Sequence, residues 1–210
     1  MYLNTTHLTL RKNLGILGIG LPILLIVGNN FELKESISHF YYSRMIVVFT
    51  GILGAFGLFL FSYRGYDVTT EKVSDNILTN LAGLLAIITA LVPTACYQLG
   101  CAELVPNGHS NSTIGTIHLI AAAGFLIIMG WMSYFRFTMG DKTDPVKKKR
   151  NRLYRICGIG LWGSLLLIAI GFVLDVNLTG IDVFIGETAA LIFFGVAWLV
   201  KGEALKSIGL

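Results

Sequence analysis

The segment that organises the chain reads Lys142-Thr143-Asp144-Pro145-Val146-Lys147-Lys148-Lys149-Arg150-Asn151-Arg152-Leu153-Tyr154-Arg155. It holds seven of the sixteen Lys and Arg residues and lies between two long apolar runs. Short loops rich in Lys and Arg stay on the cytoplasmic side when a membrane protein is inserted. The sequence therefore predicts that residues 142–155 form a cytoplasmic loop, and the orientation of the other helices follows from that placement.

The composition is typical of an integral membrane protein. Of 210 residues, 54% are hydrophobic and only 13% are charged, and the mean hydropathy is +0.72. Soluble domains carry about 25% charged residues. Nearly half of the basic residues lie in one loop, which indicates a topological signal and argues against a nucleic-acid-binding surface. No linker rich in Ser, Pro or charge divides the sequence, so residues 1–210 are predicted to form a single transmembrane domain.

Six apolar segments are predicted to be transmembrane helices. The connections between them alternate between basic and poor in Lys and Arg, with Lys34 and Arg44 as exceptions. We therefore expect an all-α polytopic transmembrane bundle of six helices in the plasma (inner) membrane, with both termini cytoplasmic. The helices are expected at about residues 14–28, 45–63, 75–97, 114–137, 156–174 and 183–200.

Two details refine this expectation. Pro22 removes a backbone donor, so a bend is expected near the middle of the first helix, and Pro93 is expected to free the carbonyl of Thr89 near the outer end of the third. Gly18-Ile19-Gly20-Leu21 recurs as Gly158-Ile159-Gly160-Leu161 in a helix of the same direction. The recurrence is consistent with three related helical hairpins that arose by duplication, and equally with coincidence in an apolar, Gly-rich chain.

Ionisable groups within the predicted helices are few, and Glu187 is the most informative of them. A carboxylate that faces lipid is costly, so Glu187 must face the bundle, be paired or carry a proton. His118 lies at a similar depth in another helix, and the polar segment before the second helix lies on the same side of the membrane. The sequence thus predicts an outward-facing polar pocket formed by Ser36, His39, Arg44, His118 and Glu187.

Three interpretations of this pocket are open. In the first, His118 bonds to a neighbouring helix's backbone, Glu187 pairs with Arg44 or His118, and the protein is a membrane scaffold without small-molecule chemistry. In the second, the pocket binds or transports a small polar solute or a lipid headgroup, with Glu187 and His118 as proton-sensitive groups. In the third, His39, His118 and Glu187 ligate a divalent metal, and the protein is a metal-dependent enzyme acting on lipid at the outer interface.

Sequence spacing does not decide among these interpretations. The chain contains no HExxH or HxxxH pair and no organic cofactor motif.

A second polar network is expected at the inner boundary. Amides that face lipid are costly, so the helix face with two Asn residues should point into the bundle. The members of this inner network are Arg64, Asp75, Asn76, Asn80 and Arg136.

The segment before the second helix, residues 31–44, mixes charged and aromatic side chains. This mixture indicates a position at the headgroup level, with Phe40, Tyr41 and Tyr42 in the aromatic belt.

A different outer segment contains two cysteines close in sequence. An oxidising compartment permits a disulfide between them, although the spacing does not require one. This candidate pair is Cys96 and Cys101.

Partners are suggested by two surface features. The run Lys147 to Arg150 is expected to contact anionic lipid headgroups. Gly51, Gly54 and Gly57 follow one side of the second helix, and small residues let another helix approach closely. This side, together with the glycines of the fifth helix, is a candidate contact for a homo-oligomer.

Several short motifs together indicate a family. They are Ser36-Ile37-Ser38, Val47-Val48-Phe49, Tyr63-Arg64-Gly65-Tyr66, Ala82-Gly83, Pro93-Thr94, His118 with Ala122, and Glu187 with Trp198 to Gly202. In these motifs the chain resembles uncharacterised small bacterial six-helix integral membrane proteins and, more distantly, the DRAM/Frag-type six-helix group.

A second resemblance, to the alkaline ceramidase and adiponectin-receptor superfamily, rests on Ser36, His39 and Asp75. The chain departs from that superfamily in its six predicted helices and in lacking paired His on the last helix, so the comparison gives little support to a zinc-dependent amide hydrolase.

Overall fold

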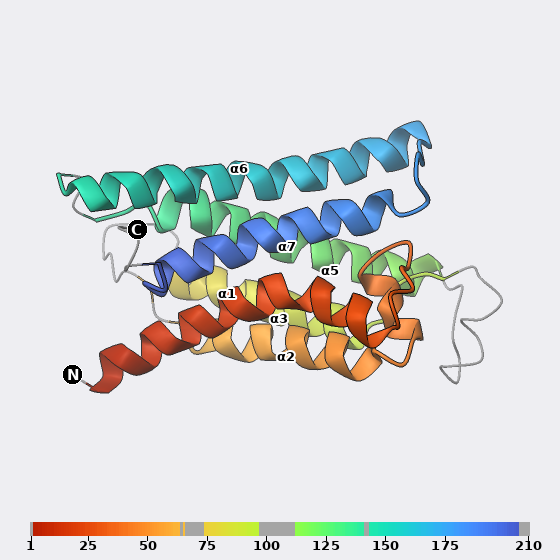
Figure 1. Ribbon diagram of the computed structural model, residues 1–210, viewed down its shortest axis with the longest axis horizontal. Helices are drawn as coiled ribbons and strands as arrows, with labels where there is room; N and C mark the ends of the chain where they lie inside the picture. The colour runs from red at the N-terminus through yellow and green to blue at the C-terminus, as the bar shows by residue number, and fades with distance from the viewer. Residues whose placement is uncertain (1, 64, 66–73, 97–111, 141–142, 206–210) are drawn as a thin grey trace.

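The protein is described by a computed structural model, which covers residues 2–63, 65, 74–96, 112–140 and 143–205. Every regular element in these ranges is helical, and six long helices form one bundle (Figure 1). This confirms the predicted all-α, six-helix architecture. The long helices are α1 (Tyr2–Gly28), α2 (Ile46–Phe61), α3 (Asp75–Leu91), α5 (Ser112–Trp131), α6 (Pro145–Leu174) and α7 (Asp182–Lys201). Two short elements complete the list: the 3-10 helix η1 (Ser38–Tyr42) and the π-helical turn η2 (Met132–Arg136).

The helices form a closed ring in which α1 lies against α7. Around the ring, α1 packs on α2, α2 on α3, α3 on α5, α5 on α6 and α6 on α7. The contact of α1 with α7 is more extensive than its contact with α2, its neighbour in sequence. In Figure 1, the beginning of α1, the beginning of α6 and the end of α7 lie at one end of the bundle, and the segment before α2 lies at the other. The origin of the fold in three duplicated hairpins stays a prediction.

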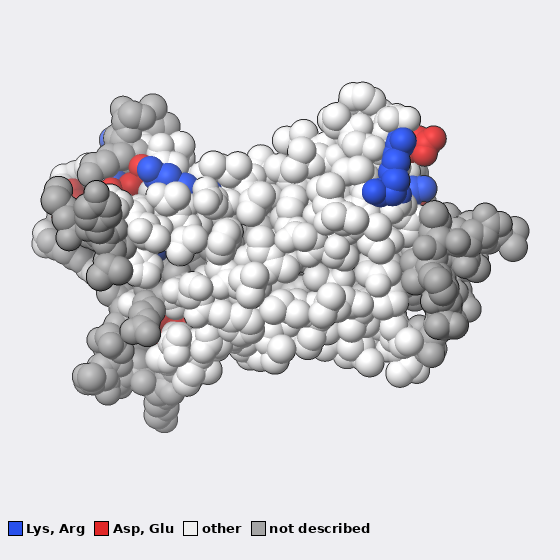
Figure 2. Space-filling view, turned by 90° about the horizontal axis from the view of Figure 1, so that it is seen from below, with Lys and Arg blue, Asp and Glu red and all other residues white. Residues whose placement is uncertain are grey.

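Apolar surface between the two ends suits a lipid environment. Four helices are long and apolar enough to cross a membrane, over Thr5–Gly28, Thr113–Arg136, Pro145–Leu174 and Asp182–Lys201. The shorter apolar helices α2 and α3 have 16 and 17 residues, and a rise of 1.5 Å per residue makes them about 25 Å long. On the face that Figure 2 shows, Lys, Arg, Asp and Glu gather at the two ends and leave the middle uncharged. The protein is therefore membrane-embedded.

Glycines let the helices approach closely at two places in the ring. A Cβ added to Gly15 of α1 would lie 2.7 Å from the carbonyl oxygen of Gly195 in α7, and the reverse substitution would give the same 2.7 Å. Gly57 of α2 and Gly83 of α3 form a similar pair, at 2.9 Å in both directions. Small residues are the usual means of close helix packing in membranes, where lipid offers no hydrophobic drive for association.

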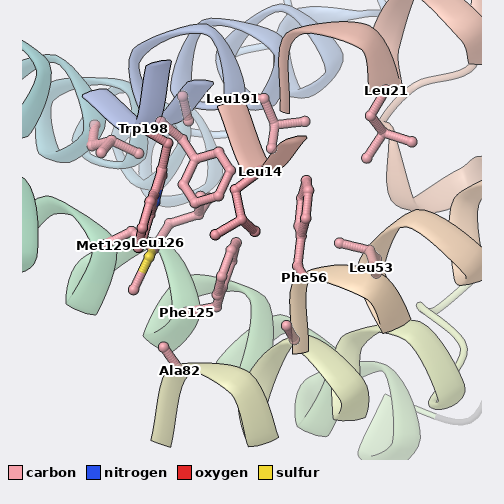
Figure 3. Close-up of a cluster of buried hydrophobic side chains, with 14 of the residues drawn as sticks. Leu14, Leu21, Leu53, Phe56, Ala82, Phe125, Leu126, Met129, Leu191 and Trp198 are labelled. Carbon is pink, nitrogen blue, oxygen red and sulfur yellow. The ribbon is translucent and has the colours of Figure 1, made fainter. Parts of the chain in front are cut away.

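Aromatic side chains fill the centre of the bundle. Phe56 of α2 lies with its ring centroid 5.1 Å from that of Phe194 in α7, and Phe125 of α5 lies 5.7 Å from the same ring. Figure 3 shows Leu14 and Leu191 converging on this cluster from α1 and α7. The core therefore joins α1, α2, α5 and α7, and it separates the two ends of the bundle.

Three predicted boundaries are wrong. Helix α6 begins at Pro145 and not near residue 156, because the Asp144 side chain accepts a hydrogen bond from the Val146 amide at 2.9 Å and caps a helix that starts with proline. The basic segment is therefore largely helical. Helix α1 extends back to Tyr2. Helix α3 ends at Leu91, since Val92 is extended before Pro93 as residues preceding proline prefer. Pro93 therefore ends this helix and does not bend it.

Candidate functional site

The segment between α1 and α2 folds back onto the end of the bundle. Asn30 and Phe31 have positive φ angles of 55° and 63°, which turn the chain out of α1. Within η1, Phe40 is fully buried and its ring lies 6.1 Å from that of Phe184 in α7. Tyr42 is also buried, and its hydroxyl donates to the Thr94 carbonyl at 2.6 Å. Because protein covers Phe40 and Tyr42, the prediction that they belong to an aromatic belt facing the membrane interface is wrong. The same cover explains how this irregular backbone is tolerated in a membrane protein.

Glu187 of α7 holds this folded-back segment by its backbone. The Ile37 amide donates to Oε2 of Glu187 at 2.5 Å, and the Ser38 amide also hydrogen-bonds to the carboxylate. These amides lie at the start of η1, where a helix leaves its N–H groups without intrahelical acceptors. A backbone bond of 3.0 Å from the Phe184 amide to the Glu35 carbonyl adds a second link to α7. Glu187 therefore caps η1 from another helix.

His118 of α5 contacts the same segment from the opposite side. Its Nδ1 lies 2.6 Å from the Val92 carbonyl oxygen, which α3 leaves unused at its end, and its Nε2 lies 2.8 Å from Ser38 Oγ. A carbonyl can only accept, so Nδ1 carries the proton and the neutral ring accepts the Ser38 hydroxyl at Nε2. His118 is 2% exposed. Ser38 is thus the point at which α5 and α7 meet through hydrogen bonds.

The other predicted pocket residues lie apart from this cluster. Ser36 Oγ lies 2.7 Å from His39 Nδ1, and His39 Nε2 lies 3.8 Å from the Glu35 carboxylate. Burial lowers the pKa of His39, while Glu35 acts in the opposite direction. Arg44 is exposed and takes no part in these bonds. The structure therefore brings His118 and Glu187 together through Ser38, a residue that the sequence analysis did not select.

A small cavity opens beside Ser38 and Glu187. Its volume is about 50 Å³, and Thr89 is the third polar residue in its lining. Since a water molecule occupies about 30 Å³ of liquid, this cavity has room for one or two waters or a small polar group. Most of its wall is apolar and comes from Leu21, Phe49, Leu53, Phe125, Leu126 and Leu191.

The arrangement of donors does not favour a metal centre or a serine nucleophile. The described residues contain no group of three or more His, Cys, Asp and Glu placed to hold a metal, and both His118 nitrogens are already engaged. The bond between Ser38 and His118 resembles a nucleophile with its base. However, the nearby amides that would stabilise an oxyanion donate to Glu187 instead.

Two members of the expected inner network meet in the structure. Asp75 and Arg136 form a buried ion pair between the start of α3 and η2. Asn76 is exposed, so the prediction that the Asn face points inward is wrong for Asn76, whereas Asn80 is partly buried. The buried side of α3 instead contains Asp75, Thr79, Ala82 and Ala86, a spacing that follows the helical period. Arg64 lies outside the described residues.

The predicted cysteine pair is described only in part. Cys96 is disulfide-bonded and 4% exposed. Cys101 lies outside the described residues. Cys157 is a free, buried cysteine in α6.

Comparisons with protein-family models, with curated proteins and with solved structures find no match to this chain. The resemblance to bacterial six-helix proteins and to the DRAM/Frag-type group therefore stays a prediction from short motifs. Function has to be argued from the site itself.

Proposed function

We propose that this protein binds the polar end of a small solute or a lipid headgroup through Ser38 and Glu187, while His118 fixes the Ser38 hydroxyl. The observation that carries the proposal is a carboxylate and a hydroxyl at the edge of a cavity with mostly apolar walls. The cavity has room for a small polar group, so a terminal ammonium or hydroxyl can enter it while the rest of the solute or lipid stays outside.

The surroundings of Glu187 restrict the chemistry of that head. The carboxylate accepts hydrogen bonds from neutral groups, namely the amides of Ile37 and Ser38. A buried carboxylate is stabilised further by a cation or by additional donors. We therefore expect a head that carries N–H or O–H groups, and an ammonium group above all.

The site is proposed to face the outside of the plasma (inner) membrane. The beginning of α1, the beginning of α6 and the end of α7 share the other end of the bundle, which includes the basic segment (Figure 1). Segments of this charge stay cytoplasmic, so both termini are proposed to be cytoplasmic and residues 36–42 to lie in the outer leaflet.

Two lysophospholipids test the proposed chemistry. The ethanolamine and choline forms share a phosphate and an alkyl chain, but only the ethanolamine head has N–H donors. We expect the reconstituted full-length protein to bind lysophosphatidylethanolamine about tenfold more tightly than lysophosphatidylcholine, the equivalent of roughly one charge-assisted hydrogen bond. Native mass spectrometry of the protein with each lipid measures this preference.

A matched pair of variants assigns the preference to the site. Glu187→Gln should abolish it, because the amide offers a neutral acceptor in place of the carboxylate. Glu35→Gln should retain it, since that substitution removes a carboxylate that is 55% exposed at the same end of the bundle. If the unaltered protein binds the two lipids equally, the proposal fails and only the role of holding residues 36–38 in place is left for the cluster.

A further inference from the structure

A second and larger cavity lies at the other end of the bundle. Its volume is about 330 Å³, and its walls come from α1, α6, α7 and the connection between η2 and α6. Four cationic side chains line it, together with two carboxylates. The cationic residues are Arg11, Lys147, Arg150 and Lys201, and the acidic ones are Asp144 and Glu203. Basic side chains therefore outnumber acidic ones in the lining.

The two carboxylates do not match the cations in number, and one is already engaged. Asp144 Oδ1 accepts the Val146 amide at 2.9 Å as the cap of α6. Glu203 Oε1 lies 3.8 Å from Arg150 Nη1, which is a long ion pair. At Arg11, the buried Nε has no hydrogen-bond partner within the described ranges. A buried donor of this kind is costly unless a ligand or water satisfies it.

The cations are positioned by rigid parts of the bundle. Lys147 Nζ donates to the Phe137 carbonyl at 2.9 Å. Lys201 Nζ lies 5.0 Å from the centroid of the Phe137 ring, and Arg11 Cζ lies 5.2 Å from that of Tyr63. Cation–π contacts of this length hold a charged group in place without neutralising it. The positive charge is thus preorganised around the cavity.

The helical register separates these residues from the other basic residues of the same segment. Lys147 and Arg150 are three positions apart, so they share one side of α6 and line the cavity. Lys148 and Lys149 lie between them in sequence and are exposed. The segment therefore has a cavity-lining pair and a surface pair of equal charge.

We propose that this cavity binds a phosphate monoester, presented either as the headgroup of phosphatidate or as a soluble phosphate ester. A monoester can carry two negative charges, which suits a lining in which basic side chains outnumber acidic ones, and its oxygens accept from Arg and Lys. The volume lies within the range of small-molecule sites. The cavity also lies at the ends of the spans that contain Arg11 and Lys201, the depth at which lipid headgroups occur.

The test compares two double variants in full-length protein reconstituted into phosphatidylcholine nanodiscs. Lys147→Gln with Arg150→Gln removes two charges from the cavity, and Lys148→Gln with Lys149→Gln removes two from the exposed side of the same helix. We expect binding of added phosphatidate to weaken roughly tenfold or more in the cavity variant and less than about twofold in the surface variant. Arg11→Gln provides an independent cavity variant.

Measurements on the unaltered protein keep the test decisive if a variant does not fold. Phosphatidate should bind more tightly than phosphatidylserine, which is anionic but has no monoester. Competition by glycerol 3-phosphate would identify a soluble ester as the ligand, whereas phosphatidate binding that resists this competitor would identify the lipid. Equal binding of phosphatidate and phosphatidylserine, or equal losses in the two double variants, would overturn the proposal in favour of unspecific surface charge. The outer site is untouched by these variants, so its proposed function stands or falls separately.

Discussion

At the scale of single residues, His39 gives the fold a dependence on pH. Burial lowers the pKa of its imidazole below 6.5, although the Glu35 carboxylate opposes the shift. A depressed pKa means that folding favours the neutral ring. The stability it contributes is therefore present above pH 6.5 and is lost as the pH falls from there through the folded-state pKa.

The loss of stability at low pH can be tested by comparing the unaltered protein with the His39→Gln variant. We expect the melting temperature of the unaltered protein to fall more steeply between about pH 7 and about pH 5 than that of His39→Gln, because glutamine does not titrate and its oxygen can still accept the Ser36 hydroxyl. Thermal unfolding in detergent, followed by circular dichroism, measures both slopes. Identical slopes would contradict the assignment.

The cost of burying polar groups explains which site residues could be anticipated. Glu187 and His118 draw attention in the sequence because charged or titratable groups are rare within apolar helices. Ser38 does not, since serine is common in loops, and its bonds exist only once residues 36–42 lie on α5 and α7. Arg44 was included for its charge and proximity in sequence, but its long side chain reaches solvent from the start of α2.

At the scale of elements, the contact between α1 and α7 depends on two glycines. A methyl group at Gly15 would meet the backbone of Gly195, which cannot move aside as a flexible side chain could. We expect Gly15→Ala to lower the free energy of unfolding by about 1–3 kcal/mol. Gly20→Ala in the same helix is the control, because an added Cβ there has no described atom within 4 Å. Thermal or denaturant unfolding distinguishes them, and equal effects would argue against this packing.

The helix ends show what hydropathy alone does not predict. Apolar runs identify the part of a helix that lies in lipid, but a hydrogen-bonded helix continues into polar sequence when a cap is available. The signal for α6 was Asp144 followed by Pro145, a helix start that precedes the apolar run. In α3, the apolar run predicts a helix that continues past Pro93 to about residue 97, although the extended conformation preferred by the residue before proline ends it at Leu91.

At the scale of the whole molecule, the number of helices is a local property and their arrangement is not. Each span is indicated by its own apolar sequence, so six helices were predictable. The contact between the first and last helices, by contrast, depends on residues such as Gly15 and Gly195 that meet only in the folded ring. The same is true of the two cavities, whose linings come from three or more helices each.

The orientation of the bundle decides which leaflet supplies each proposed ligand. We expect Lys148→Cys to react with a membrane-impermeant maleimide only after cells are opened, and Leu33→Cys, at a position that is 43% exposed, to react in intact cells. A Cys157→Ser background removes the free native thiol of α6. The reverse labelling pattern would place Glu187 in the cytoplasmic leaflet and the cationic cavity outside. The ethanolamine and phosphate ligands would then have to come from the opposite leaflets.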